Sequence, residues 1–255
     1  MSLNYSETAQ EIIDKVKCPY QVFTKENTAT EVEEAYKKAV IRGREEGFVP
    51  VLVVADETFA EWLSILEDEK YDKEAILLQN HGDGEKILKE RYEEYLEDFT
   101  DDITGEADGE EDMLLSELLG EKKDGEEILE FSSIISYEGD FIEETILFEI
   151  PVKKPWEVIA WLPMGGWNEC PEASEMMEIC RYWNKKYGAV PAVLSHDTLE
   201  FTVENLEKCK EEAWDLAKEH YAFCPDRVDQ GTRNGTIGEV ADCISKSNVW
   251  YFWWD

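Results

Sequence analysis

Positive charge is scarce in this sequence. Only 25 lysine and arginine residues oppose 60 aspartate and glutamate residues, so the net charge at pH 7 is −35. Nucleic acids and anionic membranes carry negative phosphates, which a protein of this charge would repel. We therefore exclude nucleic acid and membrane as binding partners and expect any macromolecular partner to be a basic protein.

Long apolar runs and closely paired cysteines are also lacking. No stretch approaches the about 18 apolar residues of a membrane-spanning helix, and residues 1–5 have neither the basic nor the apolar region of a signal peptide. We therefore expect a cytoplasmic protein. The six cysteines form no C-x-x-C pair, so in a reducing compartment we expect free thiols. No phosphate-binding motif occurs, and the sequence predicts no cofactor.

The first 96 residues alternate between helical and strand-like patterns. Residues 31–47 carry apolar side chains at helical spacing and end at a glycine, and the apolar run 49–55 that follows is typical of a buried strand. Further elements are expected at 58–66 (helix), 75–78 (strand) and 86–99 (helix). Residues 1–96 are therefore predicted to form an α/β segment.

An acidic connection follows at residues 97–127, which hold 14 acidic and 2 basic residues. This composition cannot bury enough apolar surface to form a core, so we expect a solvated connection with one short helix at 113–119. Strand-like residues 128–136 and 141–150 then predict a hairpin with its turn at 137–140. Residues 128–255 are predicted to form a C-terminal α+β domain.

The segment 151–255 shows the order β-α-β-β-α-β. Strands are predicted at 157–163, 189–194 and 199–203, and helices at 171–187 and from 205 onward. The last six residues, WYFWWD at 250–255, hold five consecutive aromatics that point to both faces of a strand, so we expect them to complete the sheet. This order predicts a ferredoxin-like unit packed against the N-terminal segment, within a mixed α/β arrangement of the α+β class.

Four motifs in this segment occur in a fixed order. They are GGWNECP at 165–171, YGA at 187–189, FCPD at 223–226 and the terminal WYFWWD. As a set they resemble the signature of a bacterial domain family of unknown function, over about residues 151–255. The resemblance implies a cytosolic bacterial protein, and it carries over neither an activity nor any catalytic residue.

The loop at 164–171 is the best candidate for a binding site. It joins a predicted buried strand to a helix, the position of loops that cradle phosphates with backbone N–H groups. Its candidate ligand-binding residues are Gly165, Gly166, Trp167, Asn168 and Cys170. The loop contains no lysine or arginine, and Glu169 would repel a phosphate. The alternative is a tight turn with Trp167 filling the core.

Cys170 is a candidate nucleophile, because Pro171 places it at the start of a helix, where the thiol pKa is lowered. An enzyme built on it would use His196 and Asp226, and the alternative is an inert structural thiol. Asp226 also belongs to a polar stretch, 226–235, which we expect at the surface.

His220 and Cys224 lie four residues apart near a helix end, where they could supply two metal ligands. Two ligands do not make a zinc site, and no further spacing indicates the others. We therefore predict no metal site, and the alternative is a polar helix end packed under neighbouring aromatics.

Two functions are consistent with these patterns. The first is a non-enzymatic, macromolecule-binding protein, similar to an immunity protein that neutralises a cationic toxin. The second is an enzyme or small-ligand binder that uses the 164–171 loop with Cys170. We favour the first, because the charge is extreme and no complete catalytic set is found.

Overall fold

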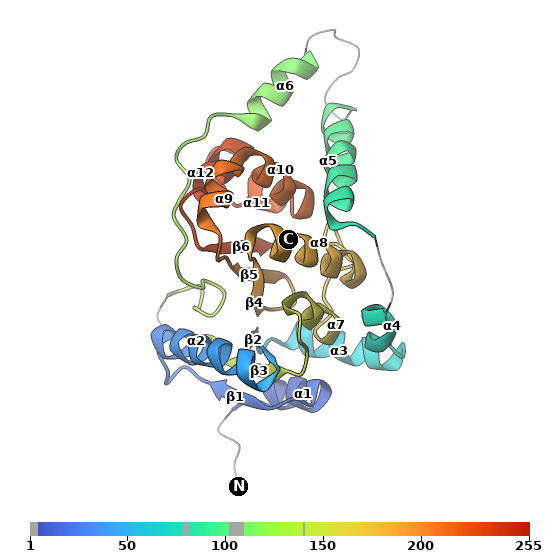
Figure 1. The fold of residues 1–255 in the computed structure, drawn as a ribbon, viewed down its shortest axis with the longest axis vertical. Helices are drawn as coiled ribbons and strands as arrows, with labels where there is room; N and C mark the ends of the chain where they lie inside the picture. The colour runs from blue at the N-terminus through green and yellow to red at the C-terminus, as the bar shows by residue number, and fades with distance from the viewer. Residues whose placement is uncertain (1–4, 79–81, 102–109, 140) are drawn as a thin grey trace.

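One mixed sheet of six strands forms the centre of the molecule. The computed structural model describes residues 5–78, 82–101, 110–139 and 141–255. The strand order is β1-β3-β2-β4-β5-β6 (Figure 1). The strands are β1 (Tyr20–Phe23), β2 (Val49–Val54), β3 (Thr145–Ile150), β4 (Val190–Leu194), β5 (Thr198–Thr202) and β6 (Val249–Trp253). The sheet therefore combines two strands from the first 96 residues with four from the C-terminal part.

The pair formed by β2 and β4 is parallel, and every other neighbouring pair is antiparallel. Strands of a parallel pair end at the same edge of a sheet, and functional residues often gather there. The loops that begin at Ala55, after β2, and at Ser195, after β4, therefore lie together.

The helices before β3 begin and end at local signals. They are α1 (Glu7–Val16), α2 (Ala29–Glu46), α3 (Glu57–Asp68), α4 (Lys73–Leu78), α5 (Gly84–Asp101) and α6 (Glu110–Leu119). At the start of α2, the Thr28 hydroxyl accepts the Glu31 N–H, and the Glu31 carboxylate accepts the Thr28 N–H. The helix ends at Gly47, whose φ of 86° is a left-handed conformation that favours glycine.

The helices after β3 cover the C-terminal strands. They are the 3₁₀ helix η1 (Pro155–Glu157), α7 (Val158–Trp161), α8 (Ala173–Tyr187), α9 (Leu206–Glu211), α10 (Ala213–Phe223), α11 (Asp226–Asp229) and α12 (Ile237–Ile244). On α8, Met176, Cys180, Trp183 and Tyr187 form one fully buried stripe. Gly188 then ends the helix in a left-handed conformation.

Alternate residues of the strands enter two separate cores. On one face, which we call the aromatic face, Phe201, Trp250 and Phe252 pack against Trp183 of α8 and Phe223 of α10. On the other, which we call the second face, Leu52, Leu147 and Val193 pack in a smaller core with side chains of α2 and of residues 128–136.

The α+β class is confirmed, but two predicted strands are helical. Residues 157–163 lie in η1, α7 and the following loop, and residues 75–78 end α4. Apolar runs this short cannot be assigned by periodicity alone. Pro155 occupies the first position of η1, and the Asp72 carboxylate accepts the Ala75 N–H at 3.0 Å, so both segments carry local helix-starting residues.

The ferredoxin-like arrangement predicted for residues 151–255 is wrong as a consequence. With no strand at 157–163, this segment supplies only β4, β5 and β6, which are antiparallel neighbours in chain order. Of the predicted hairpin, residues 145–150 form β3, and a single bridge joins Ile135 to Ile142. Residue 140 of its turn lies outside the described residues.

The terminal aromatic segment forms the strand β6, as predicted, and this strand lies at one edge of the sheet. Trp250, Phe252 and Trp254 are buried, and Tyr251 and Trp253 are partly buried on the second face. The free edge of β6 is covered by the region around α11, where Arg227 Nη1 donates to the Tyr251 carbonyl and Cys224 Sγ donates to the Trp253 carbonyl at 3.0 Å. These bonds satisfy groups that an edge strand otherwise leaves unpaired.

Part of the acidic segment packs against the C-terminal helices. The short helix predicted at 113–119 is present as α6, and Leu118 near its end is buried. Farther on, the Gly125 N–H donates to the Asp242 carboxylate of α12 at 3.0 Å. Residues 118–128 are therefore held against α12 and β6, which a solvated connection would not be.

Candidate functional site

The loop at 164–171 is a tight turn that bonds to itself. Gly165 and Gly166 have φ of 90° and 79°, and a side chain on Gly165 would collide with the Pro171 carbonyl. The Gly166 N–H donates to Cys170 O at 3.1 Å, and the Cys170 N–H donates to Trp167 O at 3.0 Å. Two N–H groups that a phosphate would need are thus already used. This favours the alternative of a structural tight turn over a phosphate-binding loop. Binding at this loop stays a prediction.

Cys170 is buried beneath this loop and is 4% exposed. Burial raises its pKa well above the ordinary range, the neighbouring Cys224 raises it further, and Arg91 lowers it only in part. The thiol therefore keeps its proton at neutral pH, whereas a nucleophile needs the thiolate. The expected lowering by the helix start is outweighed by desolvation.

His196 lies at the edge where β2 and β4 end. Its Nδ1 is 3.1 Å from Asp56 Oδ1, and its Nε2 is 3.4 Å from Asp197 Oδ2. The close contact with the Asp56 carboxylate and the charges of both carboxylates raise its pKa above the usual value, although partial burial lowers it. In the described residues, no hydrogen bond or ion pair joins His196 to Cys170 or to Asp226, so the alternative catalytic set does not assemble.

Residues 253–255 form hydrogen bonds with Asn168, Asp197 and Asp226. The Asn168 side chain donates to the Asp255 carbonyl, and the Asp226 carboxylate accepts the Asp255 N–H at 3.0 Å. Asp197 accepts the Trp253 indole N–H at 3.0 Å. The loop, the β4–β5 turn and α11 therefore meet around residues 253–255, although nothing in their spacing indicates it.

His220 and Cys224 are buried in the aromatic core rather than in a polar helix end. The His220 ring lies 4.6 Å from that of Trp250, and its nitrogens have no hydrogen-bond partner in the described structure. Burial holds its pKa well below the usual value and raises that of Cys224 to about 12. Throughout the described ranges, no three His, Cys, Asp or Glu side chains are grouped to hold a metal ion.

An acidic groove lies at the end of the sheet where β2 ends and is followed by Asp56. It has a volume of about 1200 Å³ and lies between α1, the β1–α2 turn, the β2–α3 loop and residues 141–144. Its charged lining residues, among those described, are Lys25, Glu26, Asp56, Glu57, Glu143 and Glu144. No sequence pattern indicates this site, because its charged residues come from three distant segments of the chain.

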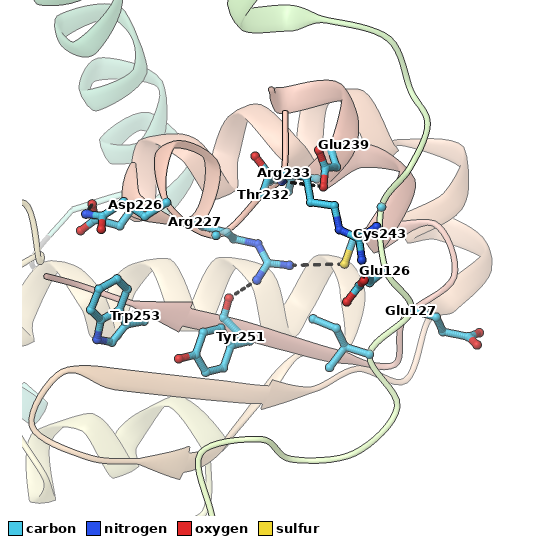
Figure 2. Close-up of a pocket in the computed structure, with 15 residues that line it drawn as sticks. Glu126, Glu127, Asp226, Arg227, Thr232, Arg233, Glu239, Cys243, Tyr251 and Trp253 are labelled. Carbon is cyan, nitrogen blue, oxygen red and sulfur yellow. Dashed lines mark hydrogen bonds and ion pairs between the residues drawn. The ribbon is translucent and has the colours of Figure 1, made fainter. Parts of the chain in front are cut away.

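A second cavity, of about 380 Å³, lies between α11, α12, β6 and residues 125–128 (Figure 2). Arg227 extends from α11 into its centre and is 7% exposed. The stretch 226–235 was predicted to be a surface loop, so the burial of Arg227 is a correction. A lone arginine between aspartates has the pattern of a solvated helix, and no sequence signal indicates that it is buried.

Comparison with known families identifies only the C-terminal segment. Residues 146–255 match the family described as "Domain of unknown function (DUF4253)", which confirms the resemblance drawn from the four motifs. Searches of curated proteins and of solved structures found no match to the chain. Among the helices of the described ranges, none has both the length and the apolar character that a membrane crossing requires.

Proposed function

We propose that this protein is a non-enzymatic binding protein that recognises a basic protein partner, in the manner of an immunity protein that neutralises a cationic toxin. The observation that carries the proposal is the acidic groove, in which five carboxylates face a single lysine among the described lining residues. Opposite charges on two surfaces speed their encounter and select the correct partner.

Two of the five carboxylates have structural roles, and three are free to meet a partner. Asp56 caps α3 through the Phe59 N–H, and Glu144 accepts the Ser6 N–H at 3.0 Å. Glu26, Glu57 and Glu143 have no ion-pair partner among the described residues. An incoming lysine or arginine would therefore not have to break an existing ion pair.

The groove suits a segment of polypeptide better than a small ion. Its volume exceeds what a single ion needs, and its carboxylates are not grouped as metal ligands. The Phe141 ring on its wall is 44% exposed, and exposed aromatic rings often anchor protein interfaces. An apolar contact beside separated negative charges fits a basic chain that also carries apolar side chains.

Charge reversal in the groove tests the proposal. The probe is a fluorescent lysine-rich peptide, titrated at about 0.1 M ionic strength and followed by anisotropy. The double variant Glu57→Lys/Glu143→Lys should weaken binding at least about tenfold, because exposed pairs contribute about 0.2–1 kcal/mol each and reversal replaces attraction by repulsion.

The matched control is Glu94→Lys/Glu211→Lys, which changes the net charge equally at exposed positions on α5 and α9. This control should change the affinity by no more than about twofold, since charges beyond about 10 Å are largely screened. Equal losses in both variants would show that the peptide senses only the overall charge, and would contradict the groove as the binding site.

A further inference from the structure

Arg227 carries a buried positive charge that no carboxylate neutralises in the described structure. Nη1 donates to the Tyr251 carbonyl, Nη2 has only Cys243 Sγ at 4.0 Å, and Nε has no partner. The guanidinium also lies 5.0 Å from the centre of the Phe252 ring. A backbone carbonyl, a thiol and an aromatic ring leave at least one donor nitrogen unsatisfied.

An uncompensated buried cation is strongly unfavourable, and it stands out in a chain with 60 acidic residues. Burial lowers the pKa of Arg227, but an arginine keeps its proton in proteins. The neighbouring Cys224 does not supply a negative charge, because burial raises its pKa to about 12. The site therefore lacks an anion.

Two carboxylates that line the cavity, Glu239 and Asp226, are already engaged elsewhere. Both oxygens of Glu239 accept backbone N–H groups, from Arg233 at 3.0 Å and Asn234 at 2.9 Å. The Asp226 carboxylate accepts the Asp255 N–H and a Gln230 side-chain N–H. Among the described residues, no ion pair joins either carboxylate to the Arg227 guanidinium, and Figure 2 draws no dashed line between them.

We propose that this cavity binds a small monocarboxylate with an apolar body, and that the ligand's carboxylate pairs with the Arg227 guanidinium. A guanidinium presents N–H donors in one plane, which match the two oxygens of a carboxylate. The pair would place a negative charge beside Nη2, where the protein itself supplies only a thiol.

The rest of the cavity selects the charge and the shape of the ligand. Glu127 lines it without an ion-pair partner among the described residues, whereas Glu126 pairs with Arg233, so Glu127 would repel a phosphate with two negative charges. Ile128, Val240 and the Trp253 ring supply apolar walls that would receive a hydrocarbon or aromatic body. Its volume of about 380 Å³ is near the lower end for ligand pockets, which favours a small acid.

This site is separate from the acidic groove in position and in chemistry. The groove borders β1, β2 and residues 141–144 and attracts cations, whereas the cavity lies beyond β6 at the opposite edge of the sheet and binds an anion (Figure 1). The two proposals can therefore fail independently.

Ligand-dependent thermal stability tests the proposal with defined probes. 3-Phenylpropionate should raise the melting temperature in a saturable manner, because a ligand that binds only the folded state stabilises it. The neutral 3-phenylpropionamide, of the same shape, and inorganic phosphate should have no effect at equal concentration. A change in the tryptophan fluorescence of the protein should follow the same acid-specific titration, since the Trp253 ring lines the cavity.

Variants assign the effect to Arg227. Arg227→Met should abolish the acid-specific shift, and Arg227→Lys should weaken binding at least about tenfold, since lysine lacks the planar pair of donors. Arg44→Met is the control, because this arginine is exposed on α2 and pairs with Glu204. It should leave the titration unchanged.

A cavity-filling variant keeps the test decisive if the Arg227 variants do not fold. Ile128→Phe leaves every charge in place and occupies the cavity, so it should reduce the acid-specific shift at least fivefold. Equal shifts with the acid and the amide, the absence of a shift in the parent protein, or an undiminished shift in Ile128→Phe would each overturn the proposal.

Discussion

The two faces of the sheet are covered by different kinds of contact. On the aromatic face, the Trp183 ring stacks on Phe252 with centroids 5.7 Å apart and meets Trp250 edge-on at 5.4 Å. On the second face, residues 128–136 form little regular structure and are attached through buried carboxylates. Glu200 of β5 is the main one, and it accepts the backbone N–H groups of residues 132 and 133.

Each face contains a buried group whose pKa is shifted by burial, and the two shifts have opposite consequences for stability. Burial raises the pKa of Glu200 to about 7, although hydrogen bonds from Ser133 and Ser132 lower it in part. Burial lowers the pKa of His220 on the aromatic face. Raising the pH should therefore weaken the second face, and lowering it should weaken the aromatic face.

The largest effect is expected from Trp183→Ala. This ring is fully buried and touches Phe201, Phe223, Trp250 and Phe252, so its removal leaves a cavity at the centre of the aromatic face. We expect the free energy of unfolding to fall by about 3–5 kcal/mol, measured by urea denaturation. A midpoint equal to the parent's would mean that the aromatic face does not carry the stability of the fold.

Glu200→Gln should remove the loss of stability that the second face undergoes as the pH rises. The folded-state pKa of about 7 lies above the ordinary value of 4.5, so the folded protein binds a proton that the unfolded chain has released. The contribution of Glu200 to parent stability should therefore fall as the pH rises from about 4.5 to 7, by on the order of 2–4 kcal/mol. The variant should show no such fall in denaturation curves taken across this range.

Glu33→Gln is a matched control for this prediction. Glu33 also holds the second face, because it accepts the Phe131 N–H at 3.2 Å, but it pairs with Lys37 as well. If both variants flattened the pH dependence to the same extent, Glu200 would not be the titrating group.

Local patterns predicted the elements that carry their own signals. The helix that ends at Gly47, the helix predicted at 171–187 and the aromatic strand predicted at 250–255 were all readable, because each depends on residues close together in the chain. The strand expected at 157–163 failed, because a short apolar run is equally compatible with a buried helix.

The acidic groove and the Arg227 cavity depend on contacts between distant segments, which local sequence patterns do not indicate. The parallel pairing of β2 with β4 places Asp56 beside His196, although 140 residues separate them. Arg227 is buried only because residues 125–128, α12 and β6 close around it. No pattern within either segment specifies such an arrangement, so both the groove and the cavity escaped prediction.

His220→Phe should sharpen the difference between the faces at acid pH. The imidazole nitrogens have no partner in the described structure, and phenylalanine fits an aromatic surrounding, so stability at pH 7 should be nearly unchanged. The depressed folded-state pKa means that only the unfolded chain takes up the proton as the pH falls below about 6.5.

The parent should therefore lose on the order of 1–2 kcal/mol between pH 7 and pH 5 through this residue, and the variant should not. Thermal denaturation at the two pH values gives the difference directly. A parallel acid loss in both proteins would place the sensitivity elsewhere and remove the contrast between the faces.

The smallest effect concerns His196, which lies at the end of the sheet and belongs to neither core. Its ion pair with Asp56 raises its pKa, so the pair stabilises the fold below about pH 6.5 and this contribution is lost as the pH rises through the folded-state value. The side chain is 37% exposed, and screening by solvent limits the contribution to less than about 1 kcal/mol.

NMR titration of the His196 imidazole should show the raised pKa. Asp56→Asn should lower this pKa, and Glu200→Gln should leave it unchanged. A response of His196 to Glu200→Gln would show that the sheet end and the second face titrate as one unit.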